Sequence, residues 1–543
     1  NVGAAGIVIT NNLKEWQHNK FIGDSLHIGS GGVTVYGDNP NTFVTFECPV
    51  VLTDAQTWHN PKLRQMDVSG TVTASGVVSS EAGKDTPVTF SGFNRIDPSL
   101  KGMSVERPAF AFKNDNTYTG DTIINSGGVL YLLFSNDFPG SKIDPESDLI
   151  LSGGGLAITG KAQVFTQSVS RLVIKAGENF IGGKNADAVF DCGEIVREGI
   201  GGTMTFPVSW AGGTTAYADN TNTDGILGGW ALLNDGAFAA MNISTRMVGQ
   251  VSTAQRWNTD SWGNNQHVVV MGGGVRTAGD VSPNSVRYQA GQPAFTNDFA
   301  DAVLTIKSGG LAVNNTAPCK LENGVLRSGF ETGELFVFTA GLFEISSKIE
   351  DNGDTPFTLV KAQSGTLVLS GELAFTGDIY LNGGKLVLTG DGAEIESEIH
   401  QSGGTTLALS NGANLKCNGD GRVLGGNLEL GSGSKLNMEI CGKTSGGDLI
   451  VPLTLPNRFG TFNVTADMEN PVELILDVAP GADIKRGNYP LIRWTDATTV
   501  SGLDVDLFAF DVHNTIQGEI VAVENGIDFV VTSVARGALI TVR

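Results

Sequence analysis

The chain has 543 residues, of which 73 are glycine, and only 17% of its residues are charged. Glycine is near twice its usual frequency and charge is well below the usual quarter or so, which favours a turn-rich β protein over a helical one. The 35 Lys and Arg residues against 57 Asp and Glu residues give a net charge of −22, and no basic run is present, so we expect no nucleic-acid partner. No apolar run approaches the roughly 18 residues needed to span a bilayer, so we expect no membrane insertion.

The first residues, NVGAAGIVITNNLKEW, lack the basic segment and following apolar segment that mark a signal peptide. A chain that starts at Asn1 rather than Met is expected to be the processed form of an exported protein. We therefore expect a secreted or cell-surface location.

Short extended segments follow one another along the chain, and each is ended by Gly, Asn, Asp or Ser. Runs of β-branched or large apolar residues between such turn residues are typical of strands. Helical periodicity is limited to the short stretch 14–21, so we predict an all-β chain. The clearest extended segments are 71–80, 148–160, 171–183, 303–315, 333–349 and 365–390.

One pattern occurs twice. NTYTGDTIINSGGVLYL at 116–132 returns as AFTGDIYLNGGKLVL at 374–388, with an aromatic residue, Thr-Gly-Asp, an apolar run, Asn, Gly-Gly and a second apolar run. Strands this short cannot bury a core alone, whereas stacked equivalent rungs give each strand a parallel neighbour. We therefore predict a right-handed parallel β-helix, a solenoid, with Gly, Asn and Asp at its corners.

The regular alternation of short apolar runs and turn residues weakens over the stretch 210–289. This stretch contains four of the seven tryptophans: Trp210, Trp230, Trp257 and Trp262. We predict an irregular Trp-rich insertion or widened rungs over 210–289. The flanking predictions are N-terminal β-helix rungs over 1–209, further rungs over 290–471, and a C-terminal β cap or end domain over 472–543.

Five cysteines are widely spaced and show no zinc-site pattern: Cys48, Cys192, Cys319, Cys417 and Cys441. We expect most of them to be small buried hydrophobic residues. Cys417 with Cys441 is the pair in which we would test for a disulfide first.

Five segments in order carry a family resemblance: 52–60, 68–72, 116–130, 222–234 and 487–502. Together they resemble the bacterial autotransporter-associated β-strand repeat proteins, which are abundant in the Verrucomicrobia, Lentisphaerae and Planctomycetes group. The resemblance covers nearly the whole chain and implies an exported parallel β-helix. It supplies no catalytic residues.

The stretch WNTDSW joins the carboxylate of Asp260 to two aromatic rings, Trp257 and Trp262, of the kind on which sugars stack. These three residues are our candidate glycan-binding site, and a packing role is the competing interpretation. A polysaccharide lyase or hydrolase acting through Asp260 is a further alternative, although we predict no catalytic residues and no enzyme activity.

Several acidic residues lie in Asp-Gly or Asn-Gly contexts, where turn formation explains them better than calcium binding. The six histidines are dispersed and show no metal-binding spacing. We therefore predict no metal site and no cofactor, with structural calcium left open. The acidic residues concerned are Asp351, Asp354, Asp391 and Asp420.

A regular, acidic rod without a recognisable site favours a structural function. We expect an extracellular building block of a cell-surface layer, filament or matrix, which self-associates as a homo-oligomer. The alternative is an adhesin or glycan-binding surface protein with surface glycans as partners.

Overall fold

The structure of this protein is a computed structural model. It describes residues 2–10, 17–36, 42–60, 72–74, 77–80, 88–92, 110–125, 127–160, 164–184, 188–207, 214–417, 421–440, 451–456, 460–478, 484–495, 498–512 and 516–534. Strands dominate this part of the chain. In it, no helix is long and apolar enough to cross a membrane.

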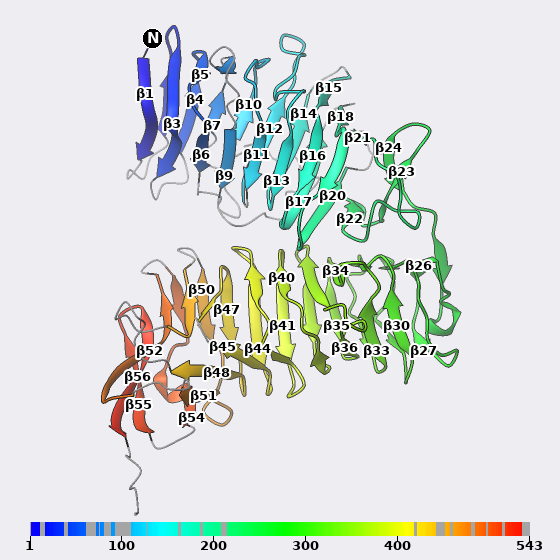
Figure 1. The fold of residues 1–543 in the computed structure, drawn as a ribbon, viewed down its shortest axis with the longest axis vertical. Helices are drawn as coiled ribbons and strands as arrows, with labels where there is room; N and C mark the ends of the chain where they lie inside the picture. Colours follow the sequence, from blue (N-terminus) through cyan, green and yellow to red (C-terminus); the bar gives the residue numbers. More distant parts are fainter. Residues whose placement is uncertain are drawn as a thin grey trace, which may run out of the picture.

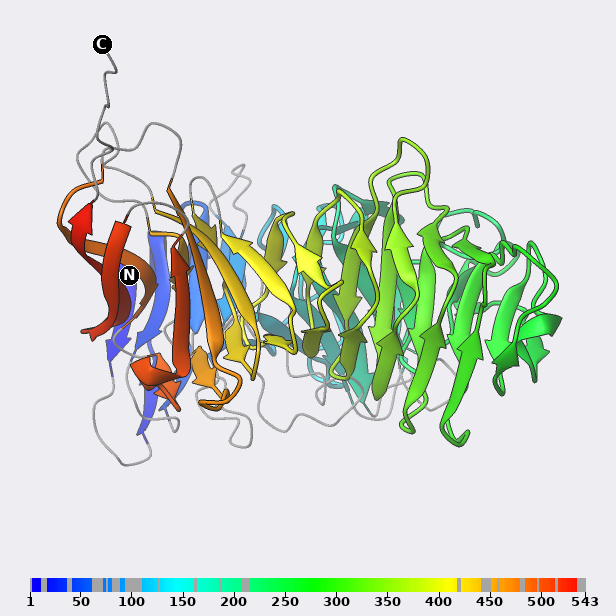
Figure 2. The ribbon, with the colours of Figure 1, turned by 90° about the horizontal axis from the view of Figure 1, so that it is seen from below.

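The chain forms two β-solenoid rods that lie side by side and run in opposite directions (Figure 1). The first rod extends from β1 (Val2–Thr10) to β22 (Ala231–Leu233), and the second begins at β25 (Ala254–Arg256). Figure 2 shows that the second rod returns to the end of the molecule where the first begins. The predicted parallel β-helix is confirmed, while the reversal between the two rods was not predicted.

Two sheets face each other between the rods. In spatial order, the first-rod facing sheet contains β2 (Gln17–Phe21), β4 (Thr42–Phe46), β7 (Val72–Ala74), β10 (Phe110–Phe112), β12 (Val129–Leu133), β14 (Gly155–Thr159), β17 (Gly177–Lys184), β20 (Gly202–Phe206) and β22. The second-rod facing sheet contains β25, β26 (His267–Val270), β28 (Ser285–Tyr288), β31 (Gly310–Val313), β34 (Glu334–Thr339), β37 (Thr358–Ala362), β40 (Ile379–Leu381) and β43 (Ile399–Gln401). All the pairings within these two sheets are parallel.

Each rod has a second long sheet. In the first rod it includes β3 (Leu26–Tyr36), β6 (Gln56–Asn60), β9 (Val88–Gly92), β11 (Thr122–Asn125), β13 (Leu149–Ser152), β16 (Arg171–Ile174) and β19 (Glu194–Arg197). In the second rod it contains β27 (Gly274–Val275), β29 (Phe295–Asp298), β32 (Cys319–Glu322), β35 (Leu342–Ile345), β38 (Thr366–Leu369), β41 (Lys385–Thr389), β44 (Thr406–Ser410), β47 (Asn427–Leu430), β50 (Thr461–Val464) and β53 (Thr499–Ser501).

The strands stack in register, so identical side-chain types form columns inside each rod. In the second rod Leu367, Leu386, Leu407 and Leu428 are register partners from β38 to β47, and all four are fully buried. The alternation of buried and half-buried positions along β41 shows why these sequences form strands: every second residue points into the rod. Burial of each such leucine contributes about 2 kcal/mol.

The repeated pattern corresponds to one corner of a rung. In the first copy the apolar runs are β11 and β12, and in the second they are β40 and β41. The glycine pair between the runs turns the chain from one face of the rod to the next. Gly384 has φ +69°, and a Cβ there would lie 2.3 Å from the carbonyl oxygen of Gly365, so glycine is required for both reasons.

The reversal between the rods contains antiparallel strands. β24 (Met247–Gln250) pairs antiparallel with both β21 (Thr215–Tyr217) and β23 (Ala239–Asn242). These strands lie inside the stretch 210–289 that the sequence marks as irregular, although β26 and β28 in the same stretch already belong to the parallel ladder. The domain boundaries themselves stay predictions.

The C-terminal stretch combines both kinds of pairing. β51 (Val472–Val478) and β54 (Phe508–Val512) continue the parallel stack of β42 (Glu394–Ile395), β45 (Asn414–Cys417) and β48 (Lys435–Ile440). An end sheet follows the order β46 (Arg422–Val423), β49 (Leu453–Leu455), β52 (Gly487–Trp494), β56 (Gly526–Val534) and β55 (Ile516–Val523). In this end sheet β56 is antiparallel to both of its neighbours.

The four cysteines within the described residues are buried and unbridged, which confirms the expectation that most are core residues. They are Cys48, Cys192, Cys319 and Cys417. The suggested partner of Cys417, Cys441, lies outside the described residues.

Candidate functional site

The three residues of the predicted glycan site lie at the end of the molecule where the chain reverses. Trp257 directly follows β25, and Asp260 belongs to a single 3-10 turn, η3 (Thr259–Ser261). The ring of Trp257 is exposed, with 65% of its surface accessible, whereas Trp262 is 3% accessible. Trp262 packs edge-on against Phe299 at 5.4 Å between ring centroids. Of the two rings, only that of Trp257 is open to a ligand.

The carboxylate of Asp260 holds a neighbouring loop. Its Oδ1 accepts hydrogen bonds from the backbone N–H groups of Thr277 (2.6 Å) and Ala278 (2.9 Å), and its Oδ2 accepts one from the Thr277 hydroxyl (2.8 Å). These bonds, the Thr277 backbone N–H first, lower the pKa of Asp260. A carboxyl group with a lowered pKa is a poor proton donor, which disfavours a role as general acid.

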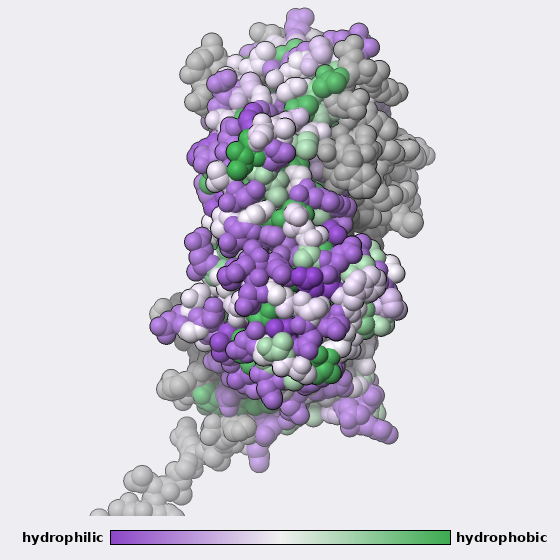
Figure 3. Space-filling model, turned by 90° about the vertical axis from the view of Figure 1, so that its right-hand side faces the viewer, coloured by the Kyte–Doolittle hydropathy of each residue, from purple (hydrophilic) through white to green (hydrophobic). Residues whose placement is uncertain are grey.

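Arg276 forms hydrogen bonds with the backbone of the turn that contains Asp260. Its side chain is buried, and its guanidinium donates to the carbonyl oxygens of Thr259 (3.1 Å), Trp262 (3.3 Å) and Gly279. The chain around Trp257 is therefore fixed by buried hydrogen bonds. Figure 3 views this end of the molecule, where hydrophilic side chains dominate and hydrophobic ones are scattered. Val275 is one of the exposed apolar residues here.

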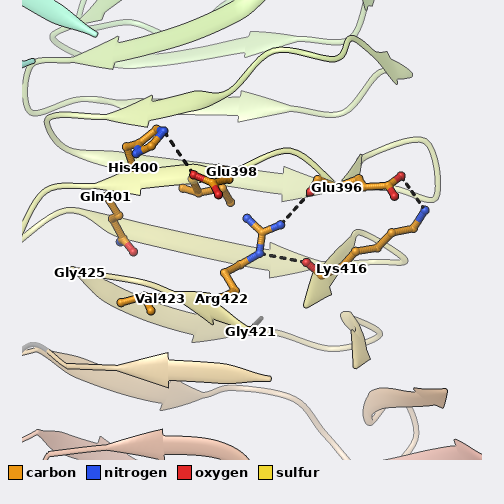
Figure 4. Close-up of a pocket in the computed structure, with 10 residues that line it drawn as sticks. Glu396, Glu398, His400, Gln401, Lys416, Gly421, Arg422, Val423 and Gly425 are labelled. Carbon is orange, nitrogen blue, oxygen red and sulfur yellow. Dashed lines mark hydrogen bonds and ion pairs between the residues drawn. The ribbon is translucent and has the colours of Figure 1, made fainter. Parts of the chain in front are cut away.

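A groove of about 590 Å³ lies farther along the second rod, where the facing sheet ends. β43 is the last strand of that sheet, and the next strand on this side, β46, belongs to the end sheet. Figure 4 shows the gap between them, with charged and apolar side chains on its walls. The lining residues are Glu396, Glu398, Ile399, His400, Gln401, Lys416, Gly421, Arg422, Val423 and Gly425.

Arg422 lies in the gap between β43 and β46, where the parallel strand pairing stops. Its guanidinium donates to the carbonyl oxygens of Lys416 (2.9 Å) and Glu396 (3.0 Å), as Figure 4 shows, and to that of Ser397 (2.9 Å). Side-chain donors here bind carbonyl groups on the walls of the gap. Val423 is exposed beside it and gives the groove an apolar surface.

Three metal-ligating side chains meet at the upper rim of this groove. Nε2 of His400 lies 3.1 Å from Oδ2 of Asp378 and 3.8 Å from Oε2 of Glu398. One ligand atom from each of the three lies within 4.8 Å of the others. The imidazole stacks on the ring of Tyr380 at 4.3 Å, which fixes its orientation. The structure thus groups residues that sequence analysis missed.

The reason for the omission is their spacing. Asp378 and His400 lie on successive rungs, 22 residues apart in sequence, so no short motif contains them. The available signal was the repeat itself: Asp378 is the Asp of the second Thr-Gly-Asp. The sequence of one rung aligned on the next would have placed Tyr380 beside His400, as the register does.

Of the acidic residues assigned to turns, Asp354 and Asp391 lie in turns. Oδ1 of Asp351 accepts the backbone N–H groups of Phe357 (2.6 Å) and Thr376 (3.1 Å), which is a turn-stabilising role. Asp391 forms an ion pair with Lys435. Asp420 lies outside the described residues.

No protein-family model matches the chain. Over 295 residues the chain is 27% identical to the adhesin BmaC autotransporter of Brucella suis biovar 1 (strain 1330). The match covers 50% of this chain and 8% of that relative, so the chain spans a small part of the relative's length. The match and the solenoid fold together fit an autotransporter-associated β-helix, and the more specific bacterial lineage stays a prediction.

Proposed function

We propose that this chain is a non-enzymatic, adhesin-like protein of the bacterial cell surface. It binds a glycan through Trp257, at the end of the molecule where the chain reverses from the first rod into the second. The observation that carries the proposal is the exposed ring of Trp257, held on a loop that buried hydrogen bonds fix. Trp is the side chain that contributes most often to binding hot spots, because a rigid ring supplies a large contact area.

The three predicted residues have different contacts, and these contacts support glycan binding by Trp257 in particular. Trp257 supplies the binding surface, Asp260 clamps the loop at Thr277, and Trp262 anchors the turn in the core. A rigid platform loses little conformational entropy when it binds, which favours affinity. The similarity to an adhesin over half of the chain agrees with this assignment.

A glycan array with the purified chain tests the proposal. We expect Trp257→Ala to weaken binding by about 2 kcal/mol, roughly thirtyfold, as for a hot-spot residue. Met468→Ala is the matched control, because Met468 is equally exposed but lies in the C-terminal part of the chain. Equal binding by wild type and Trp257→Ala, or no glycan bound by either, would refute the proposal.

A second candidate function is self-association into a layer, filament or matrix. It is favoured by β55, which forms an outer edge of the end sheet within the described part of the chain. An exposed edge strand can pair with the same strand of another copy. Light scattering and electron microscopy over a concentration series test this. Ala522→Lys, which adds a charge to an exposed position of β55, should reduce any assembly.

A further inference from the structure

We propose that Asp378, Glu398 and His400 form a binding site for a divalent transition-metal ion of the zinc type, at the rim of the groove beside β43. This site is independent of Trp257 and of the glycan-binding proposal. Two carboxylates and one imidazole are a ligand set that zinc and its neighbours accept, whereas calcium prefers oxygen ligands alone.

The distances suit a tetrahedral ion without movement of the backbone. Ligand atoms about 2.1 Å from a tetrahedral zinc ion lie about 3.4 Å from one another. The Nε2 atom of His400 lies 3.1 Å from the Asp378 oxygen and 3.8 Å from the Glu398 oxygen, on either side of that value. Small side-chain rotations are sufficient to bring all three atoms to the ion. A fourth coordination position stays open to water or to a ligand in the groove.

Comparison of the two copies of the repeat gives an independent argument. In the first copy Asp121 takes the place of Asp378, and Asp148 takes the place of Glu398. The backbone shows this equivalence, because Thr122 donates its N–H to the Asp148 carbonyl (2.9 Å) as Ile379 does to the Glu398 carbonyl (2.8 Å). Each copy therefore stacks two carboxylates on successive rungs.

The first copy uses its two carboxylates for structure. Oδ1 of Asp121 accepts the backbone N–H of Asp148 at 3.0 Å. The carboxylate of Asp148 is neutralised by Arg171 on the following rung, with the Arg171 Nε 3.1 Å from both carboxylate oxygens. This arrangement leaves no room for a cation, because a guanidinium already occupies its place.

In the second copy the corresponding carboxylates, those of Asp378 and Glu398, lie next to the imidazole of His400. Within the described residues, no Lys or Arg nitrogen lies within 4.0 Å of the Asp378 or Glu398 carboxylates, and Nε2 of His400 lies within that distance of both. Arg422, a cation on the wall of the neighbouring groove, directs its donors to three carbonyl oxygens instead. Two adjacent carboxylates repel each other, and a divalent ion relieves this repulsion.

The surroundings orient the ligands. Tyr380, which is the register partner of His400, stacks on the imidazole at an interplanar angle of 22°. The other charged groups near the site are Arg422 and Lys416 on the groove side and the Arg197–Glu334 pair near Tyr380. Arg422 lowers the affinity for a cation without blocking the site, since its donors are engaged by backbone carbonyls.

Isothermal titration of the untagged chain with Zn²⁺ at pH 7.5 tests this proposal. We expect one ion to bind at this site, with His400→Gln and Asp378→Asn each lowering the affinity at least tenfold. Asp121→Asn is the matched control, because it changes the same motif position in the first copy and should leave the affinity unchanged.

Two further measurements make the result decisive. Co²⁺ bound in place of Zn²⁺ should give a visible absorption spectrum of a four-coordinate ion that His400→Gln abolishes, and Ca²⁺ should not compete. Circular dichroism in EDTA checks that the variants fold, which we expect because the side chains of His400 and Asp378 are 41% and 40% exposed. Zn²⁺ affinity that is unchanged in His400→Gln, or no binding at millimolar Zn²⁺, would overturn the proposal.

Discussion

Arg197 and Glu334 form a two-pronged ion pair that joins the first rod to the second across 137 residues of sequence. Nη1 of Arg197 lies 2.9 Å from one carboxylate oxygen, and the other oxygen also accepts the backbone N–H of Gly201 at 2.8 Å. The guanidinium covers the ring of Phe336, which is buried between the rods. Glu334 is completely buried, so each of its bonds replaces a lost bond to water.

We expect Glu334→Gln to destabilise the protein by about 3 kcal/mol, because it leaves a guanidinium whose side chain is only 11% exposed without its counter-ion. Urea unfolding followed by circular dichroism measures the change. Glu350→Gln removes the partner of Arg327 in a partly exposed pair and is the control, with an expected loss of at most about 1 kcal/mol. Equal losses of unfolding free energy in both variants would show that the pair between the rods stabilises the protein no more than a partly exposed ion pair.

The column of leucines in the second rod leads to a second prediction. Leu386 is fully buried between its register partners Leu367 and Leu407. Leu386→Ala should cost about 3 kcal/mol, because it removes buried apolar surface and leaves a cavity between rungs that cannot close up. Val387→Ala, one residue along on the outer face of the same strand, should cost less than about 1 kcal/mol. A comparable loss at both positions in urea unfolding would contradict the inward orientation of Leu386.

The sequence was sufficient to predict the solenoid, because its signals are local. Short apolar runs with alternating burial, as in β41, and Gly-Gly corners, as at Gly384, repeat along the chain and require only neighbouring rungs. The reversal into two rods depends on contacts such as Phe336 and Phe338 with the first-rod core. All six residues of β34 are buried. Its sequence therefore does not reveal which of its side chains point into their own rod and which contact the other rod.

The candidate sites show the same limit. Trp257, Asp260 and Trp262 are close in sequence and were found together, but only the fold separates the exposed ring from the buried one. His400 and Asp378 come together because the chain advances one rung between them. Their meeting depends on the length of that rung, which differs between the two copies of the repeat.

Gly384 at the corner of the second repeat gives a third prediction. Gly384→Ala should destabilise the protein by more than about 2 kcal/mol, because it adds a positive-φ penalty to a 2.3 Å contact with the Gly365 carbonyl oxygen. Gly353→Ala separates the two effects, since Gly353 has φ +64° and open space around it. That control should cost only about 1 kcal/mol. If the two thermal midpoints fall equally, the close approach at the corner has no energetic consequence.

Lys361 leads to a prediction about pH. Its side chain is completely buried inside the second rod, where Nζ donates to the carbonyl oxygens of Ala362 (3.0 Å), Gln363 (2.8 Å) and Gly383 (2.9 Å). Burial lowers the pKa of Lys361 from 10.5 to about 7, in spite of these three acceptors. Between these two values the unfolded chain holds a proton on this amine that the folded chain lacks.

The unfolding free energy should therefore rise with pH between about 7 and 10.5 from this group, with a slope of up to about 1.4 kcal/mol per pH unit. Below about pH 7 both states are protonated, and the cost of the buried charge is fully present. Lys361→Met removes the titrating group at similar volume, so its stability should lack this rise. The difference in urea midpoint between wild type and variant isolates the effect from buried Cys192 and Cys417, whose raised pKa values act in the opposite direction. A difference that stays constant from pH 7 to 10 would show that Lys361 keeps its proton in the folded protein.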